Sequence, residues 1–222
     1  MSYVLLFLAV FVGYFLAIFL HKKEERQMGI YLAFSGAFLL SVTIFELMPE
    51  VFQDGSKNVG LYILGGILLQ IILDFFSKGA EHGHVHLPTE RRDFPWFLLL
   101  SLSIHAIMEG FPISEENNMM IGIIVHKIPV AAILSLFFMR ANYGKTTTLL
   151  FLFIFALMTP MGSWFSHAFS IFHDYHIEIN AIVIGIFLHV STTILFESSK
   201  NHKFNLAKLV SIFLGFLLAY LL

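Results

Sequence analysis

The sequence predicts an all-α, polytopic membrane protein with eight transmembrane helices. Of its 222 residues, 58% are hydrophobic and only 13% are charged, whereas charged residues make up about 25% of a typical soluble domain. Apolar runs long enough to cross a bilayer, about 20 residues in a helix, follow one another with short breaks. A single transmembrane domain over 1–222 leaves no room for a separate soluble one. The predicted spans are 3–20, 28–52, 58–77, 94–113, 118–140, 146–169, 179–197 and 204–222.

The first apolar run and the longest connection need separate interpretations. The run that begins at Met1 has no basic segment before it and no small-residue cleavage site after it. It therefore predicts a retained helix rather than a signal peptide. The connection 78–93 contains His82, His84 and His86, and we expect it to form a histidine-bearing loop.

Basic residues are distributed unevenly between the two ends of the predicted bundle. Lys and Arg near helix ends are retained on the cytoplasmic side of a membrane. Here they gather at the first, third, fifth and seventh connections, and only Lys57 lies at the opposite end. We therefore expect both termini outside the cytoplasm and the histidine loop inside it, in a protein of the bacterial inner membrane.

Cysteine is absent, while histidine is abundant for so apolar a chain, with 11 residues. The lack of cysteine excludes disulfides, thiolate metal ligands and thiol nucleophiles. A metal site would have to use imidazole, carboxylate or amide groups. The expected partners are divalent metal ions and the lipid bilayer, and no nucleic acid; the oligomeric state is left open, a homodimer being one option.

Ionisable side chains within two of the predicted helices indicate a buried ion site. A charge at the centre of a membrane helix costs about 2.5–3.5 kcal/mol, so each one calls for a partner or a function. His105 and Glu109 are four residues apart and share one helix face. In the next run, His126 precedes Pro129, which lacks a backbone donor and weakens the helix beside the imidazole. A lone histidine is usually a hydrogen-bonded core residue, but these three together favour a metal: zinc, or alternatively iron, manganese, cobalt or cadmium.

Polar residues in two other runs predict where an ion enters and leaves. Glu46 and Glu50 lie one turn apart at the non-cytoplasmic end of their run, which predicts a vestibule. An equally good alternative is that these carboxylates simply reach water at a helix end. His189, Thr193 and Glu197 form a stripe that descends to the cytoplasmic end of the seventh run, which predicts an exit or accessory path that continues to the histidine loop.

Asp74 is a further charged residue inside an apolar run. Lys78 follows it one turn later. Because oppositely charged residues at this spacing pair on a helix surface, we expect a structural ion pair rather than a metal ligand.

Several motifs resemble those of the ZIP (Zrt/Irt-like) metal transporters, and the resemblance extends over essentially the whole chain. They are H-x-x-x-E-G at His105 to Gly110, H-K-x-x-V-A at His126 to Ala131, E-L-M-P-E at Glu46 to Glu50, the Pro160 and Gly162 pair, and G-x-F-L-H-V at Gly185 to Val190. The resemblance implies eight spans, external termini, and uptake of a divalent metal through a site on the fourth and fifth spans.

Departures from the family pattern imply that a second metal site found in many members is absent. Ala106, Lys127, Val130 and Thr159 stand where such members have amide or carboxylate ligands. The ammonium of Lys127 would take the place of the second cation. This combination resembles the subgroup with H-K in the fifth span, which mostly carries zinc.

Two other functions use the same residues differently. An intramembrane zinc-dependent hydrolase would use them to hold a metal that activates water, but the chain has no H-E-x-x-H motif. A proton-coupled carrier of small solutes would use them to relay protons. The sequence favours a transporter, not an enzyme.

Overall fold

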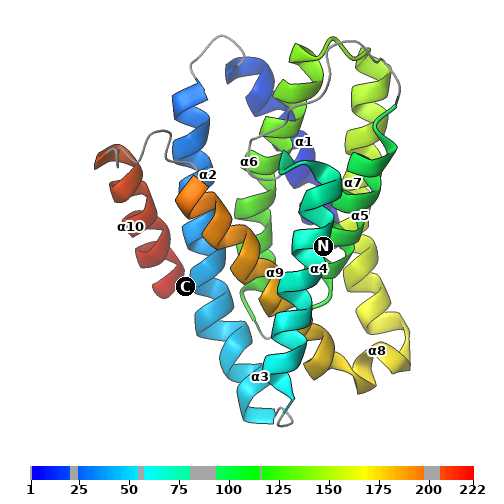
Figure 1. Ribbon diagram of the computed structural model, residues 1–222, viewed down its shortest axis with the longest axis vertical. Helices are drawn as coiled ribbons and strands as arrows, with labels where there is room; N and C mark the ends of the chain where they lie inside the picture. Colours follow the sequence, from blue (N-terminus) through cyan, green and yellow to red (C-terminus); the bar gives the residue numbers. More distant parts are fainter. Residues whose placement is uncertain (1, 21–24, 55–57, 81–93, 116, 198–205) are drawn as a thin grey trace.

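The computed structural model describes residues 2–20, 25–54, 58–80, 94–115, 117–197 and 206–222, and the regular elements among them are all helical (Figure 1). This confirms the all-α class. The elements are α1 (Ser2–Leu20), α2 (Glu25–Val42), the π-helix η1 (Thr43–Leu47), α3 (Met48–Asp54), α4 (Val59–Ser77), α5 (Trp96–Gly110), α6 (Met119–Arg140), α7 (Lys145–Ala168), α8 (Ser170–Asp174), α9 (His176–Glu197) and α10 (Leu206–Tyr220).

Among the described residues, five helical stretches are both long and apolar enough to cross a membrane. They are Met28–Gln53, Val59–Ser77, Met119–Arg140, Lys145–Ala168 and His176–Phe196. The apolar helices at Tyr3–Phe19, Trp96–Gly110 and Leu206–Tyr220 are shorter. The chain is thus a polytopic membrane protein, while the count of eight spans stays a prediction.

Glycines allow two pairs of helices to approach closely. Gly66 of α4 and Gly185 of α9 each face the backbone of the other helix, where a Cβ atom would collide with a carbonyl oxygen. Gly110 of α5 and Gly162 of α7 form a similar contact. Small residues at such crossings bring backbones together in membrane proteins, where dispersion forces contribute much of the helix association. The contacts fix α4 on α9 and α5 on α7.

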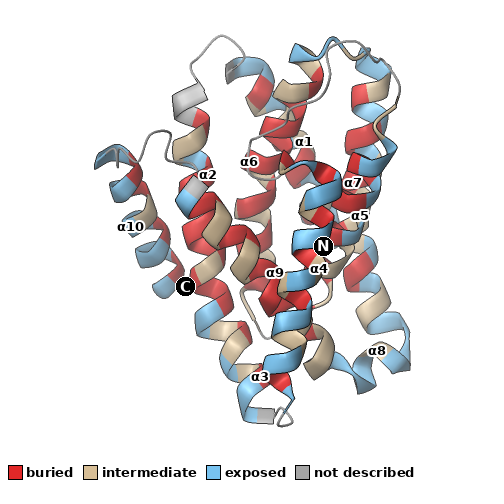
Figure 2. Ribbon diagram, viewed as in Figure 1, coloured by how far each residue is buried: buried red, intermediate tan, exposed pale blue. Residues whose placement is uncertain are grey.

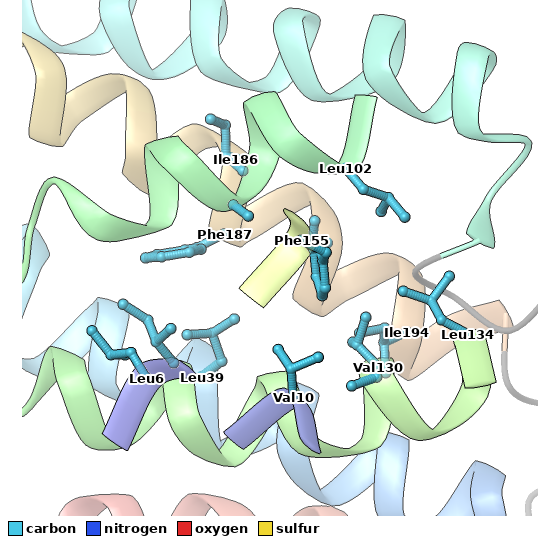
Figure 3. Close-up of a cluster of buried hydrophobic side chains, with 14 of the residues drawn as sticks. Leu6, Val10, Leu39, Leu102, Val130, Leu134, Phe155, Ile186, Phe187 and Ile194 are labelled. Atoms are coloured by element: carbon cyan, nitrogen blue, oxygen red, sulfur yellow. The ribbon is translucent and has the colours of Figure 1, made fainter. Parts of the chain in front are cut away.

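The core lies between the helices, and apolar side chains also cover the outside. Buried positions face the interior of the bundle (Figure 2). Figure 3 shows part of this core, in which Val10, Leu102, Val130 and Phe155 come from four different helices. Large apolar side chains are exposed as well, including Phe75 and Trp96, as expected of a surface that meets lipid tails rather than water.

Three local features go beyond the apolar pattern. α2, η1 and α3 follow one another without a break, and the π-helical turn lies where Glu46 begins the E-L-M-P-E motif. Such single π turns are frequent at functional sites. α6 continues through Pro129. α8 is a short helix in the stretch 170–178, which the sequence predicts to be a connection.

Candidate metal centre

His105, Glu109 and His126 meet in the interior of the bundle. α5 supplies His105 and Glu109 one turn apart, and α6 supplies His126. Each of the three residues is at most 2% exposed, and one ligand atom from each lies within 4.8 Å of the other two. The structure therefore brings together the three predicted ligands, although they come from helices whose principal packing partners differ: α7 and α4 for α5, and α1 and α2 for α6.

Glu109 is the hub of the polar contacts at this centre. One of its oxygens, Oε1, lies 3.1 Å from Nε2 of His105. The other, Oε2, accepts a hydrogen bond from Nζ of Lys127 at 2.6 Å and one from Oγ1 of Thr159 at 3.3 Å. The ammonium also lies 4.6 Å from the centroid of the Phe155 ring, a cation–π contact.

One distance between donor atoms is close to the spacing of two ligands on a small metal ion. Zinc bonds to imidazole and carboxylate of about 2.0–2.1 Å place two ligands of a tetrahedral ion about 3.3–3.4 Å apart. The 3.1 Å between His105 and Glu109 is already close to that value. Two imidazoles and one carboxylate form a set that leaves a tetrahedral position for an exchangeable ligand. The arrangement is suited to hold a divalent ion reversibly.

The four positions at which the sequence departs from the family pattern are all buried. Lys127 and Thr159 contact Glu109 directly, so both of these replacements belong to the candidate centre. Ala106 and Val130 are buried in the hydrophobic core and bring no metal-binding group. The ammonium of Lys127 thus lies beside the carboxylate of Glu109.

Glu46 and Glu50, the predicted vestibule, contact neighbouring helices. The backbone N–H of Asn118 donates to Oε2 of Glu46 at 2.6 Å, and its Nδ2 donates to Oε1 at 2.7 Å. Asn118 is the N-cap of α6. Glu46 therefore accepts hydrogen bonds at the N-terminus of the helix that carries His126, where backbone N–H groups lack partners within the helix. Glu50 accepts a hydrogen bond of 3.4 Å from Nδ2 of Asn180. Both side chains are half-buried.

The expected pairing of Asp74 with Lys78 is replaced by other contacts. Oδ1 of Asp74 accepts a hydrogen bond from Nε2 of Gln70, and Oδ2 accepts one from Nε2 of His189, each at 2.9 Å. The physical reason lies in the end of α4. Lys78 is its C-cap and has a left-handed φ of 55°, so it no longer continues the helical face that carries Asp74.

Gln70 is a buried polar residue that the sequence analysis missed. Its Oε1 lies 2.9 Å from Nδ1 of His105, and the residue is 0% exposed. The signal available in the sequence was the one glutamine in the middle of the apolar run 58–77, where an uncompensated polar group is expensive.

Part of the predicted exit path lies outside the described residues. This holds for His82, His84 and His86, and for the side chain of Glu197, the last residue of α9. His189 is described, and its side chain is 22% exposed.

A bundle of apolar helices with a buried cluster of two histidines and a glutamate defines a membrane protein with a candidate metal centre. Residues 78–222 match the sequence profile of the family described as ZIP Zinc transporter. This stretch includes every helix from α5 onward. The chain belongs to the ZIP family.

Individual relatives agree with this family. The zinc transporter ZupT of Escherichia fergusonii is 25% identical over 131 residues, which cover 51% of this chain and 49% of the relative. The zinc transporter ZIP1 of Plasmodium falciparum is 31% identical over 137 residues, 57% of this chain and 38% of the relative. Protein zntD of Dictyostelium discoideum is 30% identical over 104 residues, 39% of this chain and 15% of the relative. The aligned region spans half or less of each relative.

Proposed function

We propose that this protein transports a divalent transition metal, zinc foremost, through the centre formed by His105, Glu109 and His126. The observation that carries the proposal is the convergence of these three side chains at a buried point, within a chain of a family described as zinc transporters. Two nitrogens and one carboxylate suit zinc. Iron, manganese, cobalt and cadmium are further candidate substrates, because affinity order alone does not discriminate between such ions.

The charge at this centre favours release as well as capture. Glu109 and Lys127 neutralise one another at 2.6 Å, so with neutral imidazoles the site has no net charge before a metal arrives. A divalent ion would then leave an excess of two positive charges in a medium of low dielectric constant. We infer moderate affinity, as transport requires, because an ion must be able to leave the site it has entered.

We propose that the ion enters past Glu46 and Glu50 and leaves past His189 toward the cytoplasm. Both termini lie outside the cytoplasm in this topology of eight spans. The 78–93 loop, with His82, His84 and His86, and the side chain of Glu197 would then receive the ion on the cytoplasmic side. We propose the bacterial inner membrane as the location and a homodimer as one assembly.

We also infer that Lys127 substitutes for a second metal ion. Its ammonium contacts the Glu109 carboxylate that would otherwise be shared, while Ala106 and Val130 provide no ligand. Because Lys127 directly follows His126, the chain is proposed to belong to the H-K subgroup.

Zinc influx into proteoliposomes that contain a zinc-sensitive dye tests the transport proposal. The parental protein should admit zinc, while Glu109→Ala and His105→Ala should abolish influx and leave the protein folded and inserted. Glu115→Ala and His173→Ala are matched controls, because both of these residues are exposed. Normal influx in Glu109→Ala would refute the proposed centre.

Labelling of single cysteines tests the topology, and the absence of native cysteine makes the experiment direct. Lys145→Cys, at the first residue of α7, should react only with reagent on the cytoplasmic side. Tyr175→Cys, between α8 and α9, should react only from outside; both positions are exposed. Reaction of both from the same side would contradict the topology.

The two rival functions give different results in the same vesicles. A hydrolase would release product from a lipid or peptide, and a proton-coupled solute carrier would move protons without zinc. Membership of a transporter family argues against the hydrolase.

A further inference from the structure

A continuous chain of hydrogen bonds leads from the candidate metal centre through α4 to α9. Nδ1 of His105 lies 2.9 Å from Oε1 of Gln70. Nε2 of Gln70 donates to Oδ1 of Asp74 at 2.9 Å, and Nε2 of His189 donates to Oδ2 of the same carboxylate, also at 2.9 Å. α4 packs against both α5 and α9, so it is placed to join the two histidines.

The chemistry of these groups gives the chain a direction. A carboxylate only accepts hydrogen bonds, whereas an amide has one accepting end and one donating end. Asp74 therefore turns the NH₂ end of Gln70 toward itself, and the amide oxygen must face His105. Facing an oxygen acceptor, Nδ1 of His105 has to carry a proton.

This requirement determines which nitrogen of His105 can bind a metal. Because Nδ1 donates to Gln70, only Nε2 is left to act as a ligand. Nε2 is also the nitrogen that lies 3.1 Å from Oε1 of Glu109. The chain of hydrogen bonds thus turns the metal-binding nitrogen of His105 toward Glu109, the second predicted ligand.

We propose that Gln70 and Asp74 are positioning residues, which hold the ring of His105 so that Nε2 faces the metal and Nδ1 remains protonated. This inference rests on the proposed function. Hydrogen bonds of this kind to a metal-binding histidine fix its tautomer and ring orientation and raise its basicity. Burial makes the device effective, since Gln70 is 0% exposed and water does not compete for its amide.

Zinc uptake by variants of the chain tests the proposal. Gln70→Met replaces the amide with an unbranched apolar side chain of similar length, which preserves packing but removes the acceptor. We expect the KM for zinc to rise about 10–100-fold, the usual effect of losing a group that supports a metal ligand. The amount of folded protein in the membrane should be unchanged. An unchanged KM would overturn the proposal.

A double variant separates positioning from packing. In Gln70→Glu with Asp74→Asn, the new carboxylate accepts from Nδ1 of His105 and from the new amide, whose oxygen accepts from His189. Each hydrogen bond is preserved, and the carboxylate has moved from position 74 to position 70. The double variant should restore a KM near the parental value, whereas Gln70→Glu alone, with two facing carboxylates, should not. A double variant no better than Gln70→Met would contradict the proposal.

The tautomer of His105 gives a readout that a purely structural role would not change. With ¹⁵N-labelled histidine and bound zinc, the parental protein should show His105 protonated at Nδ1 and ligated through Nε2, its signals being identified by their loss in His105→Ala. Gln70→Met should lose this signature, and the double variant should recover it. Failure of the parental protein to transport zinc would count against the proposed function; parental transport with an unchanged Gln70→Met would count against this inference alone.

Discussion

Nζ of Lys127 lies 2.6 Å from Oε2 of Glu109, and the two side chains are 1% and 2% exposed. The principal carboxylate of the candidate metal centre is therefore paired with a cation that belongs to the protein. A metal bound by His105 and His126 would share Glu109 with this ammonium. The pair explains how a glutamate is kept inside an apolar bundle when no metal is bound, because a buried charge requires a partner.

Replacement of Lys127 by Met should make the stability of the protein depend on zinc. Removing one member of a buried ion pair costs about 3–5 kcal/mol, because the other charge is left without compensation. We expect the metal-free variant to have a lower Tm than the parental protein, and added zinc to raise its Tm by more. Thermal unfolding in detergent, with and without zinc, measures both effects. An equal response to zinc in the two proteins would contradict the role of Lys127 as counter-ion.

Replacement of Lys127 by Asp should change how much metal the protein binds, or which metal. The substitution removes a positive charge and adds a carboxylate beside Glu109, which makes a second cation at this position favourable. Metal content of the purified protein and a transport profile over zinc, iron, manganese, cobalt and cadmium measure the result. The control is Lys145→Asp, at an exposed position. An unaltered stoichiometry together with an unaltered profile would argue against the proposed replacement of the second metal.

Glu46 should contribute to stability as well as to the path of the ion. Its carboxylate binds both the backbone N–H and the side chain of Asn118 at the start of α6, and such caps contribute about 0.5–2 kcal/mol. Glu46→Gln should therefore lower the Tm more than Glu50→Gln, because the hydrogen bond that Glu50 accepts from Asn180 is longer, at 3.4 Å. If both variants raise the KM for zinc equally and leave the Tm unchanged, the vestibule is their only role and the cap is negligible.

The sequence predicted the candidate centre because its essential relations are local. His105 and Glu109 are one turn apart, so a helix is enough to place them on one face. The burial of these residues follows from the apolar runs that surround them. Placing His126 in the same cluster required one more assumption, that α5 and α6 converge. The resemblance of the motifs to those of a known family supported this assumption.

The hydrogen-bonded chain through Gln70 and Asp74 was not predictable in the same way. His105 is 35 positions from Gln70, and His189 is 115 from Asp74, so these contacts depend on how α4 packs against α5 and α9. The local rule for charges one turn apart instead suggested Lys78 as the partner of Asp74. That rule assumes that the helix continues, and α4 ends at Ser77.

Gly66→Ala should disrupt the helix packing that places Gln70 beside His105. Gly66 lies one turn before Gln70 on α4, and a Cβ atom there would collide with the backbone of Ile182 in α9. The helices would have to separate, because a backbone cannot yield as a flexible side chain does. Gly65 is the matched control: a Cβ atom there meets no atom within 4 Å, and alanine in a helix interior is favoured over glycine by about 1 kcal/mol. We therefore expect Gly66→Ala to lower both the Tm and zinc uptake, and Gly65→Ala to leave uptake unchanged with an equal or higher Tm. If the two variants behaved alike, the close contact of α4 with α9 would not be what holds Gln70 beside His105.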